Sequence, residues 1–148
     1  IYISTNYVYP GVDGDYKEDS PLLPFNKYAW SKLGGECAVK LYDNSLIVRM
    51  SMNRKPFPLP KALVDVKNSF MFNDEAAKVV LNLLDEVGIV NVGGPKKSIY
   101  EFVKEHQPDI GKIKYEDVTD VGIGKDTSMD ISKLKKILEK KWLNKKTH

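Results

Sequence analysis

One stretch decides the fold of this chain: ISTNYVYPGVDGDYKEDSPLLPFNKYAWSK, which runs from Ile3 to Lys32. Its β-branched and aromatic start predicts a strand over Ile1–Ser4. Pro10-Gly11 and Asp13-Gly14 then indicate a loop, and a helix is predicted over 26–42. The stretch is therefore expected to form a strand, an acidic loop and a helix.

The rest of the chain continues this alternation. Leu46–Met50 is an apolar run typical of a strand buried on both faces, and Ile89–Val92 is a further strand. Because helices separate them, these two runs and Ile1–Ser4 are expected to pair in one parallel sheet. Residues 53–72, with three prolines, are expected to be irregular. The order predicts an α/β protein.

Cap signals place the remaining helices. One helix is expected to have Asn73 as its cap and to end at Gly88. Ser98 and Glu101 predict a capping box for a helix that stops before Pro108. The last helix is expected to be capped by Ser132 or Asp130, and residues 113–116 are a candidate strand.

Composition sets broad limits. The chain has 148 residues, 42% of them hydrophobic and 29% charged, which suits one soluble domain or half of a larger one. No apolar run approaches the roughly 20 residues that cross a bilayer. The one cysteine, Cys37, excludes an internal disulfide framework and fits a reducing, cytoplasmic location.

The helix over 26–42 has an apolar residue at every fourth position. Ala29, Leu33, Cys37 and Leu41 are therefore expected to form its buried stripe, with Cys37 in the core rather than acting as a nucleophile. The pair Gly34-Gly35 suggests close packing against another backbone.

The basic end of the chain has a plain explanation. Residues 133–146 contain seven lysines and one acid, Glu139, within a net charge of +3 for the chain. The lysines are expected to form the solvated face of a helix whose apolar stripe consists of Leu134, Ile137, Leu138 and Trp142. Neither a nucleic-acid partner nor a membrane is expected.

Tyr28 and Lys32 have the spacing of neighbours on one helix face. A lysine ammonium beside a phenol favours the ionised phenol, which helps the tyrosine to exchange a proton with a carbonyl or an alcohol. The hydroxyls of Ser4 and Thr5 lie at the carboxyl end of a strand, where parallel sheets place their sites. The three elements together predict a proton-transfer site.

The spacing alone is weak evidence. With 8 tyrosines among 148 residues, about one Tyr-x-x-x-Lys pair is expected by chance, and the chain has a second, Tyr100 and Lys104. No strand end with hydroxyls precedes that pair, so it is expected to be an ordinary surface pair.

At this point the motifs can be compared with a known family. STNYVYPG, YKEDSPLLPFNKYAWSKLGGE, LIVRMSM, GIVNVGGPKKSIYEF and TSMDISKLKKIL resemble the extended short-chain dehydrogenase/reductase superfamily, most closely its dTDP-4-dehydrorhamnose reductase branch. The resemblance implies the C-terminal half of a Rossmann-like doubly wound parallel sheet plus a small substrate-binding lobe. Residues 1–52 would belong to the Rossmann-like domain and 53–148 to the lobe, with 73–92 returning a helix and a strand to the core.

The resemblance also implies roles. It makes Thr5, Tyr28 and Lys32 catalytic: Thr5 positions the substrate carbonyl, Tyr28 is the general acid, and Tyr28 and Lys32 contact NADPH or NADH. Thr5, Asn6, Tyr7 and Met52 fall where the family binds its nucleotide sugar. The implied reaction is NAD(P)H-dependent reduction of a 4-keto nucleotide sugar in the cytoplasm, and a homodimer is considered for the full-length protein. Glu36 is interpreted as structural.

Several positions depart from the family pattern. Asn6 replaces the usual Asp, Met52 replaces Trp, and Ile123-Gly124 replace Arg-Pro, with Lys125 as a substitute phosphate contact. The printed sequence also has no Gly-x-x-Gly-x-x-Gly turn for a dinucleotide. The chain is therefore expected to be part of a longer reductase, and to be inactive alone.

Two alternatives remain open. One is an epimerase or dehydratase of the same superfamily, although a dehydratase usually has an acid beside the strand-end threonine, where this chain has Asn6. The other is a non-catalytic protein that binds sugar nucleotides or regulates a partner.

Overall fold

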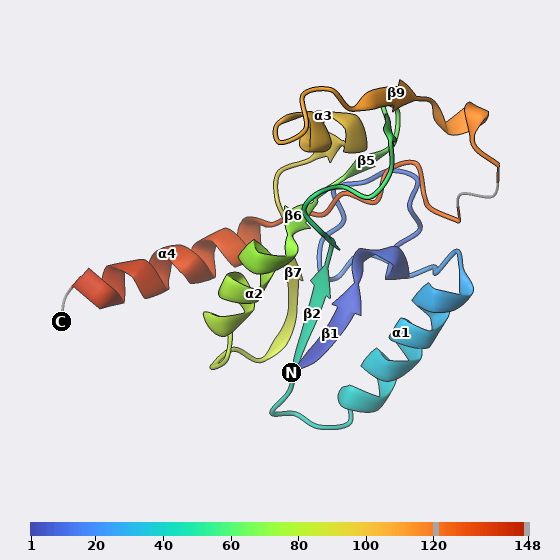
Figure 1. The fold of residues 1–148 in the computed structure, drawn as a ribbon. Helices are drawn as coiled ribbons and strands as arrows, with labels where there is room; N and C mark the ends of the chain where they lie inside the picture. The colour runs from blue at the N-terminus through green and yellow to red at the C-terminus, as the bar shows by residue number, and fades with distance from the viewer. Residues whose placement is uncertain (120–121, 147–148) are drawn as a thin grey trace.

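A computed structural model describes residues 1–119 and 122–146 (Figure 1). Its strands are β1 (Tyr2–Thr5), β2 (Leu46–Met50), β3 (Met52–Asn53), β4 (Lys61–Leu63), β5 (Lys67–Asn68), β6 (Met71–Phe72), β7 (Gly88–Val92), β8 (Lys97–Ser98) and β9 (Gly111–Ile113). Its helices are α1 (Lys27–Val39), α2 (Asn73–Leu81), α3 (Ile99–Lys104) and α4 (Ser132–Lys146), with 3-10 turns η1 (Asn6–Val8) and η2 (Tyr115–Asp117).

A parallel sheet in the order β1-β2-β7 supports the molecule. Thr5 pairs with Met50, and Met50 pairs with Val92, so the three strands end level with one another. The expected sheet is thereby confirmed. Its carboxyl edge is where side chains from different strands can meet.

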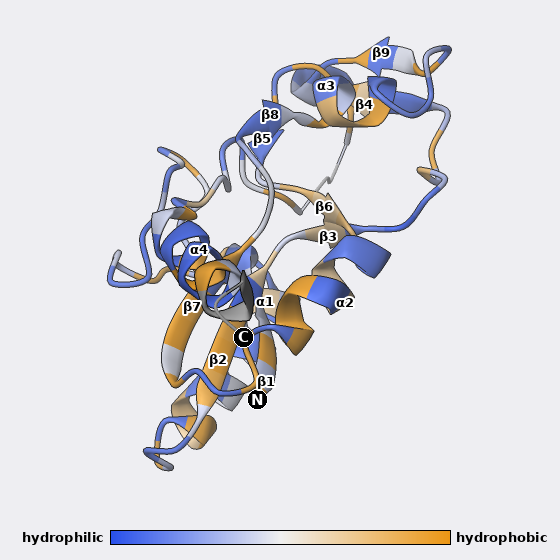
Figure 2. Cartoon of the chain, turned by 90° about the vertical axis from the view of Figure 1, so that its left-hand side faces the viewer, coloured by the Kyte–Doolittle hydropathy of each residue, from blue (hydrophilic) through white to orange (hydrophobic). Residues whose placement is uncertain are grey.

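Helices cover both faces of this sheet. Figure 1 shows α1 on one face and α2 with α4 on the other. Alternate residues of β2, among them Val48 and Met50, join Val90, Leu83 and Leu134 in a buried cluster under α2 and α4. Figure 2 shows β2 and β7 coloured mainly as hydrophobic, as expected for strands covered on both faces.

The buried stripe expected on α1 is confirmed at Ala29 and in part at Leu33, which packs against the cluster of Val8 and Tyr9, but it is wrong at Cys37 and Leu41. Ala29 is fully buried, but Cys37 is exposed and Leu41 is 90% exposed. The inner face instead continues through Glu36, which is 0% exposed. Gly35 does pack closely, but against the Tyr2 phenol rather than a backbone, because an added Cβ would overlap the Tyr2 hydroxyl.

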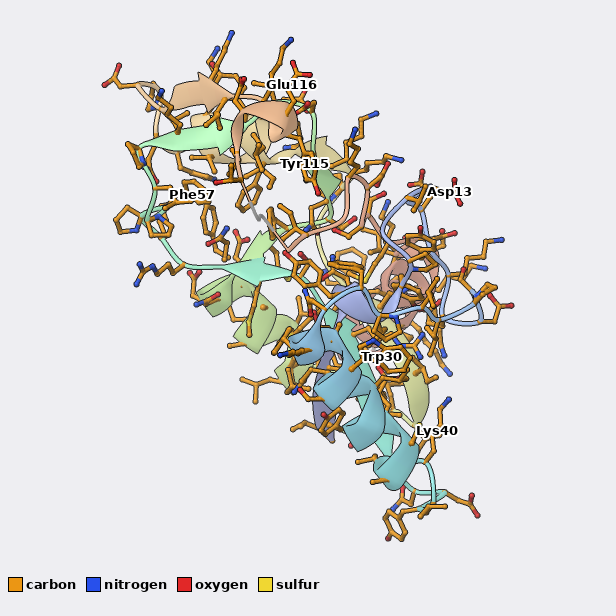
Figure 3. All side chains as sticks on the ribbon, turned by 90° about the vertical axis from the view of Figure 1, so that its right-hand side faces the viewer. Asp13, Trp30, Lys40, Phe57, Tyr115 and Glu116 are labelled. Atoms are coloured by element: carbon orange, nitrogen blue, oxygen red, sulfur yellow. The ribbon has the colours of Figure 1, made fainter. Side chains whose placement is uncertain are left out.

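The upper lobe, residues 57–68 and 97–118, stands at the carboxyl edge of the sheet. Figure 3 marks it by Phe57 and Tyr115, and marks α1 by Trp30 and its C-cap by Lys40. Parallel pairing of β4 with β9 and antiparallel pairing of β5 with β8 hold the lobe together. Its own cluster includes Leu63, Val66, Phe102 and, from β6, Phe72. The expectation that residues 53–72 are irregular is therefore wrong, because they contain short strands with distant partners.

The helix caps agree with the sequence in part. Ser98 Oγ accepts the Glu101 N–H at 3.1 Å, and Glu101 accepts the Ser98 N–H at 2.7 Å, so the capping box is confirmed. Asp130 accepts the Ser132 N–H at 2.7 Å at the start of α4. Asn73 does not cap α2 but is its first residue, and α2 ends at Leu81 rather than at Gly88, which begins β7.

The last helix packs on the sheet through part of its expected stripe. Leu134 is buried, and Ile137 and Leu138 pack against the same cluster, whereas Trp142 is 57% exposed. The candidate strand over 113–116 is displaced to Gly111–Ile113. Over residues 1–119 and 122–146, no helix is long and apolar enough to cross a membrane.

Candidate active site

A cleft of about 250 Å³ opens at the carboxyl edge of the sheet. It lies where β1 and β2 end and α1 begins. Five of the six predicted site residues line it: Thr5, Asn6, Tyr7, Tyr28 and Met52. Ser4, Ser51 and Phe70 complete much of the wall. The sequence missed Ser51, although it follows β2 at the same level as Asn6 follows β1, and it missed Phe70 because residues 53–72 were expected to be irregular.

Thr5 places a hydroxyl in this cleft. It ends β1 and caps η1, because its Oγ1 accepts the Tyr7 N–H at 3.2 Å. The same hydroxyl donates to Asn6 Oδ1 at 3.5 Å, which is at the long limit for a hydrogen bond. The Thr5 proton is therefore held weakly and can turn to a better acceptor in the cleft.

Two tyrosines bring further hydroxyls. Tyr28 lies in the first turn of α1, and its side chain is 55% exposed. Burial, and to a smaller extent the neighbouring Tyr28, raises the pKa of Tyr7. Tyr7 therefore stays protonated at neutral pH and can act as a hydrogen-bond donor beside Tyr28.

Lys32 is the predicted site residue outside this lining. Its ammonium lies 4.6 Å from the centroid of the Tyr2 ring, as a cation–π contact. The Tyr2 hydroxyl in turn donates to the backbone oxygen of Lys32 at 3.2 Å. The structure thus places Lys32 one helical turn from Tyr28 but in contact with Tyr2.

A buried ion pair fixes α1 against the sheet behind the cleft. Arg49 Nη2 lies 2.8 Å from Glu36 Oε2, and their side chains are 1% and 0% exposed. Ser4 donates to Glu36 at 2.5 Å. Burial lowers the pKa of Arg49, but hydrogen bonds to Glu36 and contacts with Tyr9 outweigh it and raise that pKa above its usual range. Glu36 thereby joins the helix of Tyr28 to the strand of Thr5, in agreement with a structural role.

A second cleft, of about 390 Å³, shares no lining residue with the first. It is lined by Phe25, Tyr115 and Lys125, among others. Phe25 of this cleft contacts Tyr7 of the first with ring centroids 5.2 Å apart, so the walls of the two clefts touch at these rings. The arrangement suits an elongated ligand whose two parts differ in chemistry.

Neither Gly11 nor Gly14 forms a cradle for a dinucleotide pyrophosphate. Gly11 and Gly14 have positive φ, but the space beside Gly14 is filled by the Asp126 carboxylate and the space beside Gly11 by the Gly124 backbone. The Asp126 carboxylate is itself paired with Lys96 at 2.8 Å and so stays in this space, and the glycine-rich turn is absent from the printed sequence. Across the same described residues, no group of three or more His, Cys, Asp or Glu side chains could hold a metal ion.

Comparisons with known proteins show what the chain as a whole resembles. The family model for the RmlD substrate binding domain matches residues 1–53. A hypothetical dTDP-4-dehydrorhamnose reductase from Sulfolobus tokodaii is 32% identical, with a TM-score of 0.76 over 91% of this chain and 56% of its own. Comparison with curated proteins gives no match.

Two more distant structures share the fold. A dTDP-4-dehydrorhamnose reductase from Bacillus anthracis, in complex with NADP, is 22% identical with a TM-score of 0.75 over 90% of this chain and 57% of its own. A UDP-glucuronic acid 4-epimerase from Bacillus cereus, in complex with UDP-glucuronic acid and NAD, is 21% identical with a TM-score of 0.73 over 93% of this chain and 54% of its own. The chain thus spans little more than half the length of these proteins, and the Rossmann-like α/β fold and the resemblance found in the motifs are confirmed.

Proposed function

We propose that this chain, a relative of the dTDP-4-dehydrorhamnose reductases, forms the proton-transfer and substrate-binding part of an NAD(P)H-dependent reductase of 4-keto nucleotide sugars. One observation carries the proposal: the hydroxyl-bearing side chains of Thr5 and Tyr28 come from different elements yet line the same cleft. The amide Asn6, where a dehydratase usually has an acid, favours reduction over dehydration.

The roles of the residues follow from their chemistry. When bound, a reduced nicotinamide nucleotide supplies the hydride that adds to the carbonyl carbon. Thr5 holds the carbonyl oxygen through its weakly held proton, and Tyr28 donates a proton to that oxygen as charge develops on it. Because Tyr28 is 55% exposed, solvent can return the proton to its phenolate after release of the alcohol.

In this proposal the nucleotide sugar spans both clefts. The sugar occupies the cleft of Thr5 and Tyr28, with Met52 and Phe70 on its apolar side. The nucleoside diphosphate extends past Tyr7 and Phe25 toward Lys125, whose ammonium suits a phosphate. Lys125 takes this role because Ile123-Gly124 replace the family's Arg-Pro.

These residues would contact only one end of the cofactor. Tyr28 and Lys32 are assigned to its nicotinamide end, whereas the pyrophosphate does not fit at Gly11 or Gly14.

Residues 1–52 belong in this proposal to the Rossmann-like domain and 53–148 to the substrate lobe, with 73–92 returned to the core. The 148 residues alone are proposed to be inactive, and the location to be cytoplasmic, in keeping with a single cysteine.

The test is oxidation of NADPH by the full-length protein with a dTDP-4-keto-6-deoxy sugar. Tyr28→Phe removes one hydroxyl and little volume, so folding should persist while kcat falls by about a hundredfold to ten-thousandfold. The matched control is Tyr100→Phe. Tyr100 has the same spacing to Lys104, whose ammonium lies 5.6 Å from its ring centroid, but it belongs to α3.

The control should leave the rate unchanged. Equal rates for Tyr28→Phe and Tyr100→Phe would contradict the assignment of Tyr28 as the acid. Failure of the unmodified full-length protein to reduce any 4-keto nucleotide sugar would contradict the proposed reaction itself.

A further inference from the structure

A buried amide lies at the centre of the hydrogen bonds beneath the first cleft. Asn68, on β5 of the upper lobe, is 2% exposed. Its Oδ1 accepts hydrogen bonds from Asn6 Nδ2 at 3.1 Å, from Ser51 Oγ at 2.5 Å and from the Ser69 N–H at 2.7 Å. Three donors on one oxygen settle the orientation of this amide group, with its oxygen toward the sheet.

Two of these donors lie at the carboxyl edge of the sheet. Asn6 follows Thr5 at the end of β1, and Ser51 follows Met50 at the end of β2. The second amide hydrogen of Asn6 donates to the backbone oxygen of Thr127 at 2.9 Å. Asn68 therefore ties the ends of two neighbouring strands to the upper lobe.

The bond to Asn68 also orients Asn6 toward Thr5. With its nitrogen engaged by Asn68 and Thr127, Asn6 presents its Oδ1 to the Thr5 hydroxyl at 3.5 Å. A continuous chain of contacts thus runs from Asn68 through Asn6 to the hydroxyl that lines the cleft. An Asp at position 6 would have no N–H for either acceptor, so the two asparagines form a matched pair in this chain.

We propose that Asn68 is a positioning residue, which acts through Asn6 to hold the end of β1, and with it the Thr5 oxygen, in place for the substrate, while the Thr5 proton stays free to turn toward the carbonyl. It also sets the width of the cleft, because Ser51 lines one side and Phe70, two residues after Asn68, lines another. This inference rests on the proposed function, although its geometric part can be tested separately.

The kinetic test uses three variants of the full-length protein. Asn68→Ala removes the acceptor, and a displaced Thr5 should lower kcat/KM by about tenfold to a hundredfold, with a raised KM for the nucleotide sugar and an unchanged KM for NADPH. Asn68→Asp keeps an acceptor oxygen, and its three donors compensate the charge, so most of the loss should be rescued. The control is Asn91→Ala.

Asn91 is a suitable control because it is also a buried asparagine with several partners. It is 0% exposed, accepts the Tyr9 hydroxyl at 2.8 Å and donates to the Tyr16 backbone oxygen at 2.9 Å, outside the cleft. Asn91→Ala should lower the melting temperature as Asn68→Ala does, yet leave both KM values unchanged. Equal kinetic losses in the two variants would overturn the proposal.

Hydrogen exchange of the Tyr7 amide provides a test that does not depend on catalysis. This N–H donates to Thr5 Oγ1 at 3.2 Å, so exchange should quicken several-fold in Asn68→Ala and remain slow in Asn68→Asp and Asn91→Ala. Unchanged Tyr7 exchange in Asn68→Ala would overturn the positioning role even if the protein is a reductase.

If Asn68→Ala does not fold, the same comparison is made with Asn68→Ser, whose hydroxyl is too short to reach Asn6. If the expected exchange is found in a protein that reduces no keto sugar, only the proposed function fails.

Discussion

At the residue scale, the pair of Glu36 and Arg49 shows how an ion pair can replace apolar packing inside the molecule. Both charges are almost fully withdrawn from solvent, and Arg49 also donates to the Tyr9 hydroxyl at 2.9 Å and to the Glu18 backbone oxygen at 3.0 Å. Such a pair adds little net stability compared with an apolar pair, but removal of one partner leaves a buried charge without compensation.

Glu36→Ala should therefore lower the free energy of unfolding by about 3–5 kcal/mol, measured by urea denaturation. Replacement of both partners, as Glu36→Leu with Arg49→Met, should cost less than Glu36→Ala alone, because no unpaired charge remains. Glu139→Ala, at an exposed position of α4, is the control and should change stability by less than about 0.5 kcal/mol. A double variant less stable than Glu36→Ala would rule out this explanation.

At the element scale, the sequence predicted the sheet correctly but not the buried face of α1. The three strands are β-branched runs whose burial on both faces leaves a clear signal. The stripe of Ala29, Leu33, Cys37 and Leu41 has a spacing of four, and each step of four residues turns about 40° beyond a full helical turn. By Cys37 the stripe has rotated about 80° away from the face that begins at Ala29, and Leu41 lies beyond the end of α1 at Val39. The true face follows the 3.6-residue period to Glu36, which apolar periodicity does not reveal.

The polar residues of the site could also be predicted only in part from the sequence. Thr5 and Tyr28 belong to one motif with a recognisable order. Asn68 lies 62 residues from Asn6, in a segment whose two-residue strands depend on distant partners. Local propensity contains no information on such a contact, so the motifs alone did not predict it.

The capping box of α3 leads to a prediction on acid stability. Hydrogen bonds from the Ser98 backbone and side chain lower the pKa of Glu101 below its ordinary 4.5. The ionised carboxylate therefore stabilises the fold above pH 4.5, and this stabilisation is lost as the pH falls through the lower, folded-state pKa. Glu101→Gln should flatten the acid side of a plot of melting temperature against pH, whereas Glu139→Gln should not. Identical acid sides for Glu101→Gln and the unmodified chain would refute this assignment.

At the scale of the whole molecule, β1 is an edge strand of the described sheet. β2 pairs with one side of it, and no described strand pairs with the other. Ile1, beside this edge, is 56% exposed. Open edges of this kind can pair with another strand.

The 148-residue chain should accordingly self-associate through β1. Sedimentation velocity should show a sedimentation coefficient that rises with concentration, and Ile1→Lys should suppress the rise by placing a charge at the edge. Leu41→Lys is the control, because Leu41 is 90% exposed but lies in the turn after α1, outside the strand edge. Equal suppression by both variants would show that general surface polarity, rather than the edge, governs association.

The outward position of Cys37 has a practical consequence. It is the one thiol of the chain, and it is exposed on the helix that bears Tyr28. A maleimide-linked spin label or dye can therefore be attached at a single known point without removal of other cysteines. Because Glu36, the next residue, faces the sheet while Cys37 faces solvent, the label would report the motion of α1 without touching the cleft.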